Sequence, residues 1–208
     1  MHPHIYYVFI ALASYLIGTS NLAFYISKIK KISMRDGGSG NLGASNAMIL
    51  MGWKAGIAVG VHDIGKAVLA VLLSKLFFPE LYLAGTIAGC CCVTGHIFPF
   101  YLKFKGGKGF ASYIGMIVAL DWKAAIIMVI LIVAITLITD YIVLATMTTV
   151  ILFPVFTFFE TGILGALIVS LSSAVIVIKH RKNIVRIIKG TEIGLRKASK
   201  GEYRSKKP

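Results

Sequence analysis

Long apolar runs alternate with short polar connectors along most of the chain. A bilayer core about 30 Å thick is crossed by about 20 apolar residues in a helix, so each long run predicts a membrane-spanning helix. We expect helices at residues 5–27, 55–78, 81–101, 110–120, 122–138, 141–159 and 163–178. The pattern therefore predicts an all-α integral membrane protein with seven transmembrane helices.

The charged residues in the connectors orient these helices. Lysine and arginine gather at residues 28–35, 103–108 and 179–189, after the first, third and seventh predicted helices. The alternate connectors carry mixed or acidic charge, namely Lys75 with Glu80, Asp121 with Lys123, and Glu160. Because positive residues favour the cytoplasmic side of a membrane, we expect the N-terminus outside and the C-terminus in the cytoplasm.

Composition supports the membrane assignment. Of the 208 residues, 57% are hydrophobic and 14% are charged, whereas about a quarter are charged in soluble domains. The net charge is +14, and half of the 22 basic residues lie from Lys179 to the end. Such residues beside membrane helices suit anionic lipid and anionic substrates. The sequence contains no element that reads a nucleic-acid groove, so we exclude nucleic acid as a partner. We expect one membrane domain at residues 1–190 and a basic cytoplasmic tail at 191–208.

Two glycine-rich segments fall on the predicted cytoplasmic side. The first reads GGSGNLGASN over residues 37–46, and the second reads KFKGGKGFAS over residues 103–112. Glycine lets successive backbone N–H groups converge on an anion, and the helix predicted to start at residue 110 adds free N–H groups. Lys105 and Lys108 add full positive charge. Neither segment has the spacing of a nucleotide-binding motif, so the pattern predicts phosphate-binding loops, with structural turns as the alternative.

A third polar segment, KHRKNIVRIIKGTE, follows the last predicted helix. His180 and Asn183 are three residues apart, so on a helix they share one face and form a small polar platform. Inside the second predicted helix, Asp63 and Lys66 have the same spacing. We expect them to form a structural ion pair that braces the first glycine-rich segment. His96 either ends the third predicted helix or bonds to a loop.

Three segments together carry a family resemblance: GSGNLGASN, GHIFPFYLKFKGGKGFAS and HRKNIVRIIKGTE. In order and spacing they resemble the cytoplasmic motifs of the bacterial acyl-phosphate:glycerol-3-phosphate acyltransferases. The resemblance implies a multi-pass enzyme of the bacterial cell (inner) membrane, with its active site facing the cytoplasm and with no metal or other cofactor. It implies transfer of a fatty acyl group from acyl phosphate to the 1-hydroxyl of glycerol 3-phosphate, which gives lysophosphatidic acid for phospholipid biosynthesis. The expected partners are these two substrates and membrane lipid, and no protein partner is indicated.

The resemblance also assigns site residues by their positions in the motifs. It implies a catalytic set made of Ser39, Asn41, Lys108, His180 and Asn183. The phosphate-binding positions are Gly40, Gly43, Ser45, Asn46, Gly106, Gly107 and Gly109, to which we add the neighbouring cations Lys105 and Arg35. Structural support is expected from Glu192 in the third motif and from Asp63, Lys66 and His96.

Three positions depart from the family pattern. The family arginine that follows the first motif is Ile49 here, the family serine that opens the sixth predicted helix is Val143, and Asp140 stands where the family has a basic residue. The missing arginine and serine would help to hold glycerol phosphate, and Arg35 and Thr146 are candidates to replace them. The departures leave open an inactive paralogue or an acyltransferase with another acceptor. A non-enzymatic transporter or scaffold is the remaining alternative, although a transporter needs polar residues across the membrane midplane.

Overall fold

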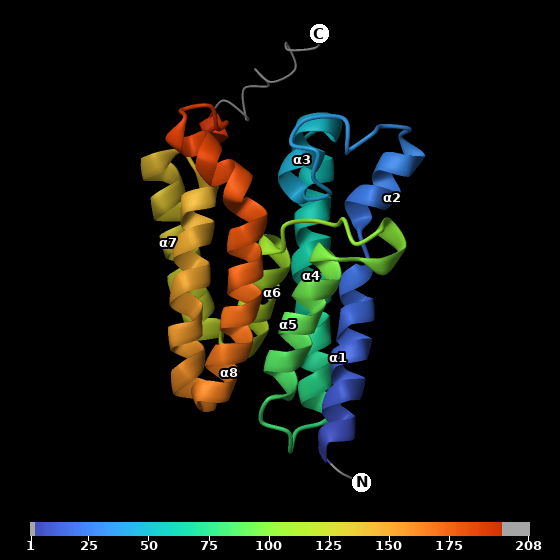
Figure 1. The fold of residues 1–208 in the computed structure, drawn as a ribbon, viewed down its shortest axis with the longest axis vertical. Coiled ribbons are helices and arrows are strands. Elements are labelled where there is room, and N and C mark those ends of the chain that lie inside the picture. The colour runs from blue at the N-terminus through green and yellow to red at the C-terminus, as the bar shows by residue number, and fades with distance from the viewer. Residues whose placement is uncertain (1–2, 197–208) are drawn as a thin grey trace.

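The computed structural model describes residues 3–196 and contains only helices and connecting loops over that range. The helices are α1 (Pro3–Thr19), α2 (Leu22–Ile29), α3 (Ala44–Met51), α4 (Trp53–Phe77), α5 (Ala84–Ile97), the short 3₁₀ helix η1 (Phe100–Leu102), α6 (Phe110–Leu120), α7 (Trp122–Thr139) and α8 (Ile142–Ile188). The long helices run along the longest axis of the molecule (Figure 1). The all-α membrane fold predicted from the apolar runs is confirmed.

Within residues 3–196, five helical segments are long and apolar enough to cross a membrane. They are His4–Ile29, Trp53–Phe77, Ala84–Leu102, Trp122–Thr139 and Ile142–Ile188, and the apolar helix α6 is shorter. The helix α8 is not straight, because Gly162 has non-helical backbone angles (φ 69°, ψ −166°). In Figure 1 the chain descends through the first half of α8 and returns through the second half, so α8 is a hairpin of two antiparallel arms.

The predicted boundaries agree closely for α4, α6 and α7 and differ elsewhere for identifiable reasons. The first predicted helix is wrong at residues 20–21, where the chain breaks between α1 and α2. Asn21 stands at this break, where its side-chain oxygen accepts a hydrogen bond from Phe24 N–H (2.8 Å) and caps α2. The helix α3 is missed because its eight residues are too few to give a periodic apolar signal. The last helix continues past residue 178 to Ile188, which places His180 and Asn183 on it.

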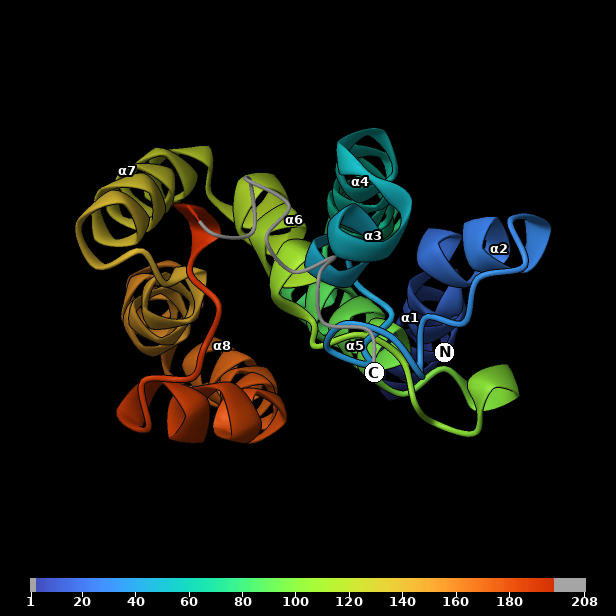
Figure 2. The ribbon, with the colours of Figure 1, turned by 90° about the horizontal axis from the view of Figure 1, so that it is seen from above.

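Close backbone contact joins α1 to α5. Gly18 of α1 faces the Cys92 carbonyl, Gly95 of α5 faces the Tyr15 carbonyl, and a Cβ added to either glycine would collide with the facing oxygen. Small residues allow such an approach between membrane helices, where packing drives association. The helix α4 packs against α1, α5 and α6 and completes this half of the molecule (Figure 2).

The second half consists of α7 and the two arms of α8, which lie together on the left of Figure 2. One apolar core joins the halves. Tyr113 of α6 is fully buried in it, and its ring packs edge-on against Phe153 of α8 (ring centroids 5.9 Å apart). The Tyr113 hydroxyl pairs with Ser173 Oγ of α8 (2.7 Å), so the buried phenol has its polar partner. The core therefore fixes α8 against α6, next to the end of the second glycine-rich motif.

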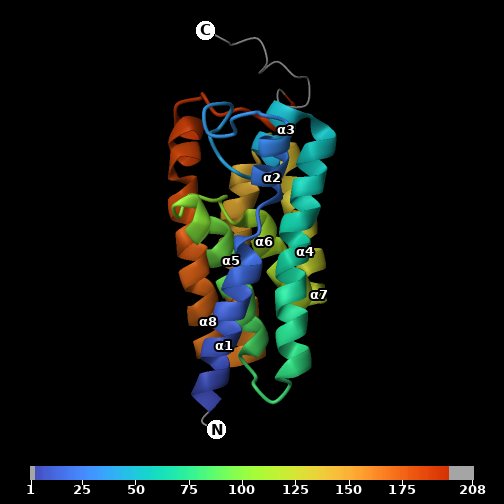
Figure 3. The ribbon, with the colours of Figure 1, turned by 90° about the vertical axis from the view of Figure 1, so that its right-hand side faces the viewer.

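The polar motifs gather at one end of this bundle. Figures 1 and 3 place the loop between α2 and α3 and the C-terminal end of α8 at the same end, opposite the N-terminal end of α1. The connector between α4 and α5 and the turn of the α8 hairpin lie at the other end (Figure 1). Residues 197–208 of the predicted basic tail lie outside the described residues.

Candidate active site

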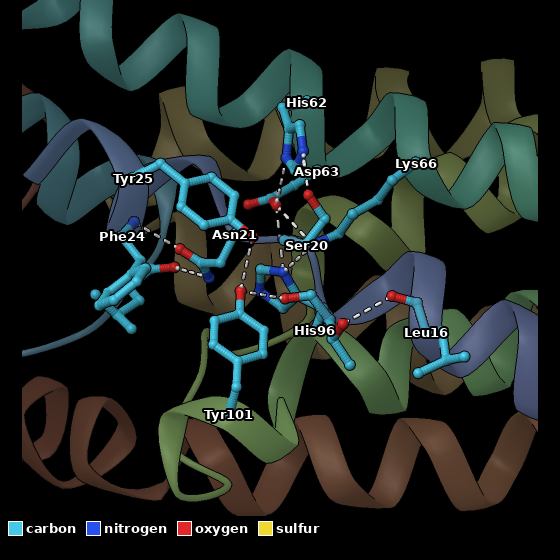
Figure 4. Close-up of polar contacts among 12 residues, drawn as sticks. Leu16, Ser20, Asn21, Phe24, Tyr25, His62, Asp63, Lys66, His96 and Tyr101 are labelled. Atoms are coloured by element: carbon cyan, nitrogen blue, oxygen red, sulfur yellow. Dashed lines mark hydrogen bonds and ion pairs between the residues drawn. The ribbon is translucent and has the colours of Figure 1, made fainter. Parts of the chain in front are cut away.

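A buried charged cluster lies where α1 gives way to α2 (Figure 4). Lys66 of α4 is at its centre. Its Nζ donates to the Ser20 carbonyl (2.6 Å) and lies 3.0 Å from Asp63 Oδ1 and 2.9 Å from His96 Nδ1. Asp63 Oδ1 is 3.3 Å from the same imidazole nitrogen. The contact between Asp63 and Lys66 is the one predicted from their spacing. An unpaired buried charge is costly, and Lys66 gains a further partner in the Ser20 carbonyl, which lies at the helix break.

Both glycine-rich loops are attached to this cluster. At the helix break, Asn21 Nδ2 donates to the Leu42 carbonyl of the first loop (3.2 Å). On the other side, the His96 carbonyl accepts a hydrogen bond from Gly107 N–H (3.1 Å) in the second loop. The imidazole packs so tightly there that a Cβ on Gly107 would collide with His96 Nε2. The sequence predicts that the ion pair of Asp63 and Lys66 braces the first loop. In the structure this ion pair also contacts His96, which bonds to the second loop.

Asn46 holds the first loop in shape. Its side chain is 1% exposed, and its Oδ1 accepts a hydrogen bond from Ser39 N–H (2.8 Å). Its Nδ2 donates to the carbonyls of Met34 (2.9 Å) and Asn41 (2.9 Å), which uses both N–H donors of the amide. Asn46, a predicted phosphate-binding residue, therefore directs its amide at the backbone of the loop.

Glycines and small polar residues make up the rest of the first loop around Asn46. Gly38 and Gly40 have φ angles of 60° and 68°, a backbone conformation that glycine adopts without steric cost. Ser39 and Ser45 are exposed and Asn41 is half-buried. Their hydroxyl and amide groups are therefore accessible to an anion, as the motif predicts.

The second loop offers fewer backbone donors than its sequence suggests. Gly106 N–H donates to the Ile97 carbonyl (3.0 Å), and Gly107 N–H is already bonded to the end of α5. These two glycines bring the loop close to α5, and they do not direct their amides at a ligand. The helices α3 and α6 begin directly after Gly43 and Gly109, and neither N-cap has a side-chain hydrogen bond. The first N–H groups of both helices therefore remain suited to an anion.

Lys108 links the second motif to the third. Its Nζ donates to Asn183 Oδ1 (2.7 Å), 75 residues further along the chain. Burial lowers the pKa of Lys108 to about 8, while the negative charge of Glu192 opposes this shift and the positive charge of Arg186 adds to it. Lys108 is therefore mostly protonated near neutral pH but loses its proton at a lower pH than an ordinary lysine.

Glu192 is the last residue of the third motif and bonds to two other residues of that motif. Its carboxylate accepts hydrogen bonds from Asn183 Nδ2 (2.5 Å) and from Arg186 Nε (2.6 Å). These charge-assisted contacts fix the amide of Asn183 in the orientation that presents its oxygen to Lys108. Arg186 is not among the predicted site residues, although its three-residue spacing from Asn183 on one helix face is a signal that identifies it.

His180 lies one turn before Asn183 on α8 and is buried. Its Nδ1 is 2.8 Å from the Ile176 carbonyl. Because a carbonyl oxygen only accepts, Nδ1 carries the proton of the neutral imidazole, and Nε2 keeps its lone pair. The charges of Lys108 and Glu192 act on His180, so the imidazole belongs to the same polar cluster.

Arg35 links the first motif to the second. One of its guanidinium nitrogens donates to the Lys105 carbonyl (2.7 Å), 70 residues away in sequence. Arg35 and Lys105 are both exposed, so two cations stand where the glycine-rich loops meet. Thr146 is buried, and its hydroxyl donates to the Ile142 carbonyl within α8 (2.9 Å). Of the two candidates to replace the missing family groups, only Arg35 is therefore placed between the loops.

Comparisons with known proteins point to one family. The family profile described as glycerol-3-phosphate acyltransferase matches residues 8–190. Glycerol-3-phosphate acyltransferase 1 of Oceanobacillus iheyensis is 34% identical over 190 residues, which cover 88% of this chain and 92% of that protein. The glycerol-3-phosphate acyltransferase of Thermoanaerobacter pseudethanolicus is 36% identical over 193 residues, which cover 90% of this chain and 94% of that protein.

Solved structures give the same result. The glycerol 3-phosphate form of PlsY (YgiH), an integral membrane glycerol 3-phosphate acyltransferase, matches with a TM-score of 0.85 and 29% sequence identity. The match covers 93% of this chain and 97% of that one. The lysophosphatidic acid form of PlsY matches with a TM-score of 0.80 and 29% identity and covers 90% of this chain and 94% of that one.

The buried cluster predicts a strong stability effect. Lys66→Met should lower the free energy of unfolding by about 3–5 kcal/mol, because it leaves the Asp63 carboxylate buried without its lysine partner. The double variant Asp63→Asn, Lys66→Met should recover part of this loss, since neither charge remains.

Denaturant unfolding of the purified protein in detergent measures both effects. The control is Lys54→Met, which replaces an exposed lysine of the same helix and should change stability by less than about 0.5 kcal/mol. A Lys66→Met variant as stable as this control would show that Lys66 does not stabilise the buried Asp63 carboxylate.

Proposed function

The chain belongs to the glycerol-3-phosphate acyltransferase family, and we propose that it transfers a fatty acyl group from an acyl phosphate to the 1-hydroxyl of glycerol 3-phosphate. It is a membrane acyltransferase, and the product of this transfer is lysophosphatidic acid for phospholipid biosynthesis. The two forms of PlsY, with glycerol 3-phosphate and with lysophosphatidic acid, correspond to the acceptor and the product of this reaction.

The meeting of the three motifs is the observation that carries the proposal. The side chain of Arg35 bonds to the second motif, and the side chain of Lys108 bonds to the third, across 70 and 75 residues of sequence. The acyl donor and the acyl acceptor both carry a phosphate group. The site therefore needs two neighbouring sets of hydrogen-bond donors or cations, one for each phosphate. Two glycine-rich loops joined by cations and helix N-termini supply such groups.

Lys108 is the residue that we expect to stabilise charge during the transfer. An ammonium has three N–H donors, and Asn183 takes up one of them. The others suit the phosphate of the donor and the oxyanion that develops on its carbonyl. Such a contact is worth more in the transition state than in the ground state, because the oxyanion exists only there.

In this proposal His180 orients the attacking hydroxyl through Nε2, the ring nitrogen that does not bond to the Ile176 carbonyl. The 1-hydroxyl oxygen of glycerol 3-phosphate forms the new ester bond with the acyl carbonyl carbon, and the bond from that carbon to the phosphate oxygen breaks. The hydroxyl proton ends on the departing phosphate. An acyl phosphate is a mixed anhydride with a good leaving group, so alignment and charge stabilisation supply most of what the reaction requires.

The first loop and Arg35 hold the phosphates in this proposal. Ser39, Ser45 and Asn41 supply hydroxyl and amide donors, and the N-terminus of α3 adds backbone N–H groups. Arg35 supplies the guanidinium that the family pattern has at the position of Ile49. Its bond to the Lys105 carbonyl supports this role, because it holds the charge at the junction of the loops.

We also propose seven membrane crossings, made by α1 with α2, by α4, α5, α6 and α7, and by the two arms of α8. The hairpin at Gly162 supports this count, since it turns one long segment into two. The basic segments then lie in the cytoplasm with the active site, the N-terminus lies outside, and the membrane is the bacterial inner membrane. Residues 1–190 form the membrane domain, and 191–208 form a basic tail.

The proposed substrates can be tested directly. Purified protein should form lysophosphatidic acid from palmitoyl phosphate and labelled glycerol 3-phosphate, and it should form none when palmitoyl-coenzyme A replaces palmitoyl phosphate. Labelled glycerol serves as the control acceptor and should remain unacylated, because it lacks the phosphate that the loops bind. Product from the coenzyme A thioester alone would overturn the proposed donor.

Lys108 should control the alkaline limb of the pH profile. A lysine is charged below its pKa, so kcat/KM of the wild type should fall as the pH rises through about 8. Lys108→Arg should abolish this fall, because a guanidinium stays protonated throughout the range. Lys108→Ala should lower turnover about 100-fold or more, as expected for the loss of a charged transition-state contact. Identical alkaline limbs in wild type and Lys108→Arg would exclude Lys108 as the titrating group.

The seven-crossing proposal predicts which loops face each side. Single cysteines in place of Arg35, Lys105 or Lys182 should react with a membrane-impermeant thiol reagent only from the cytoplasmic side. A cysteine in place of Lys123 should react only from the outside. Protein without an introduced cysteine gives the background from Cys90, Cys91 and Cys92. Labelling of all four positions from one side would rule out the proposed topology.

A further inference from the structure

Asp140 is the C-cap residue of α7. The connection between α7 and α8 lies at the end of the molecule that carries the motifs (Figure 1). The backbone of Asp140 is left-handed (φ 67°), and its carbonyl accepts a hydrogen bond from Leu195 N–H (2.9 Å). Its Oδ1 accepts a second hydrogen bond, from Arg196 N–H (2.9 Å). Gly194 is buried against the same carboxylate, and a Cβ there would collide with Oδ2. Residues 194–196 are therefore held on Asp140 by backbone contacts that suit an acidic acceptor.

Arg196 adds a contact of its own to this attachment. Its guanidinium donates to the Leu137 carbonyl in the last turn of α7 (2.9 Å), where a helix leaves carbonyl groups without intrahelical partners. A basic residue at position 140, as the family pattern has, would donate only and would repel Arg196. The acidic residue is thus matched to the segment that it holds.

Glu192 lies just before the attached segment 194–196. Only one residue separates Glu192 from Gly194. The Glu192 carboxylate bonds to Asn183 and Arg186, and the Asn183 oxygen accepts from Lys108. A continuous series of contacts therefore runs from Asp140 to the lysine that we place in the active site.

We propose that Asp140 is a positioning residue: it fastens residues 194–196 to the end of α7 and so keeps Glu192, Asn183 and Lys108 in their working arrangement. This inference rests on the proposed function, in which Lys108 contacts substrate.

Two variants of Asp140 distinguish the contribution of its carboxylate from that of its left-handed backbone. Asp140→Gly keeps the left-handed conformation without strain and removes the side-chain acceptor. Asp140→Asn keeps an acceptor oxygen and also tolerates positive φ. We expect Asp140→Gly to lower turnover about fivefold to tenfold, the effect of losing one hydrogen bond at the site, and Asp140→Asn to remain close to wild type.

Gly194→Ala tests the same contact from the other side. In the wild type the added methyl group displaces the carboxylate and breaks its bond to Arg196 N–H, so this variant should resemble Asp140→Gly. In the Asp140→Gly background the methyl group meets no carboxylate. The double variant should therefore be no more impaired than Asp140→Gly alone, a non-additivity that two unrelated defects would not produce.

Two measurements are independent of activity. Hydrogen exchange at the amides of Leu195 and Arg196 should become faster in Asp140→Gly and stay slow in Asp140→Asn. The pH dependence of Lys108 acetylation, followed by mass spectrometry, should shift to lower pH in Asp140→Gly. The charged and titratable groups that act on Lys108 are Glu192, Arg186 and His180, and release of the segment moves the negative one away.

Each outcome decides between the proposals. Unchanged exchange in Asp140→Gly would overturn the attachment, and faster exchange with unchanged Lys108 acetylation and turnover would overturn the positioning role. If the wild type made no lysophosphatidic acid from acyl phosphate and glycerol 3-phosphate, the proposed function would fail. Exchange and acetylation would still decide whether Asp140 holds the segment and whether the segment acts on Lys108.

Discussion

A lysine ammonium buried among helices has to find its partners inside the protein, because the apolar core of a membrane offers none. Lys66 meets this constraint where α1 stops, between the Ser20 carbonyl and the Asp63 carboxylate. The buried charge and the broken helix compensate each other: the break leaves a carbonyl without an intrahelical partner, and the lysine needs an acceptor. Both glycine-rich loops are attached here, the first through Asn21 and the second through His96, so the geometry of the site depends on this contact.

The functional end is then assembled by side chains that reach from one motif to the next. Arg35 ties the first loop to the second, and Lys108 ties the second to α8. Burial lowers the pKa of Lys108 to about 8 and also reduces the local dielectric, which strengthens the attraction between its ammonium and a phosphate. One environment therefore makes the lysine easier to deprotonate and more effective while it is charged.

The three departures from the family pattern differ in what the structure places around them. An arginine is absent at Ile49, but Arg35 stands at the junction of the two loops. Val143 is buried in α8, and the nearby hydroxyl of Thr146 is bonded within its own helix, so the family serine has no evident replacement in this segment. At Asp140 a carboxylate stands where the family pattern has a basic residue, and it accepts a hydrogen bond from Arg196 N–H in the backbone that follows α8.

The apolar runs alone determined most of the helices, because length and hydropathy are local properties. They locate α4, α6 and α7 almost to the residue. The glycine-rich segments and the spacing of His180 and Asn183 determined where the polar chemistry lies, since composition and helix periodicity are also local. Only the tertiary structure decided that α1 breaks at Ser20, that Gly106 and Gly107 direct their amides to α5, and that Glu192 holds Arg186. Ser20, which binds Lys66, and the partners of Arg35 and Lys108 come from other segments, up to 75 residues away. Such contacts depend on how helices pack against each other, and no local pattern along the chain encodes those distances.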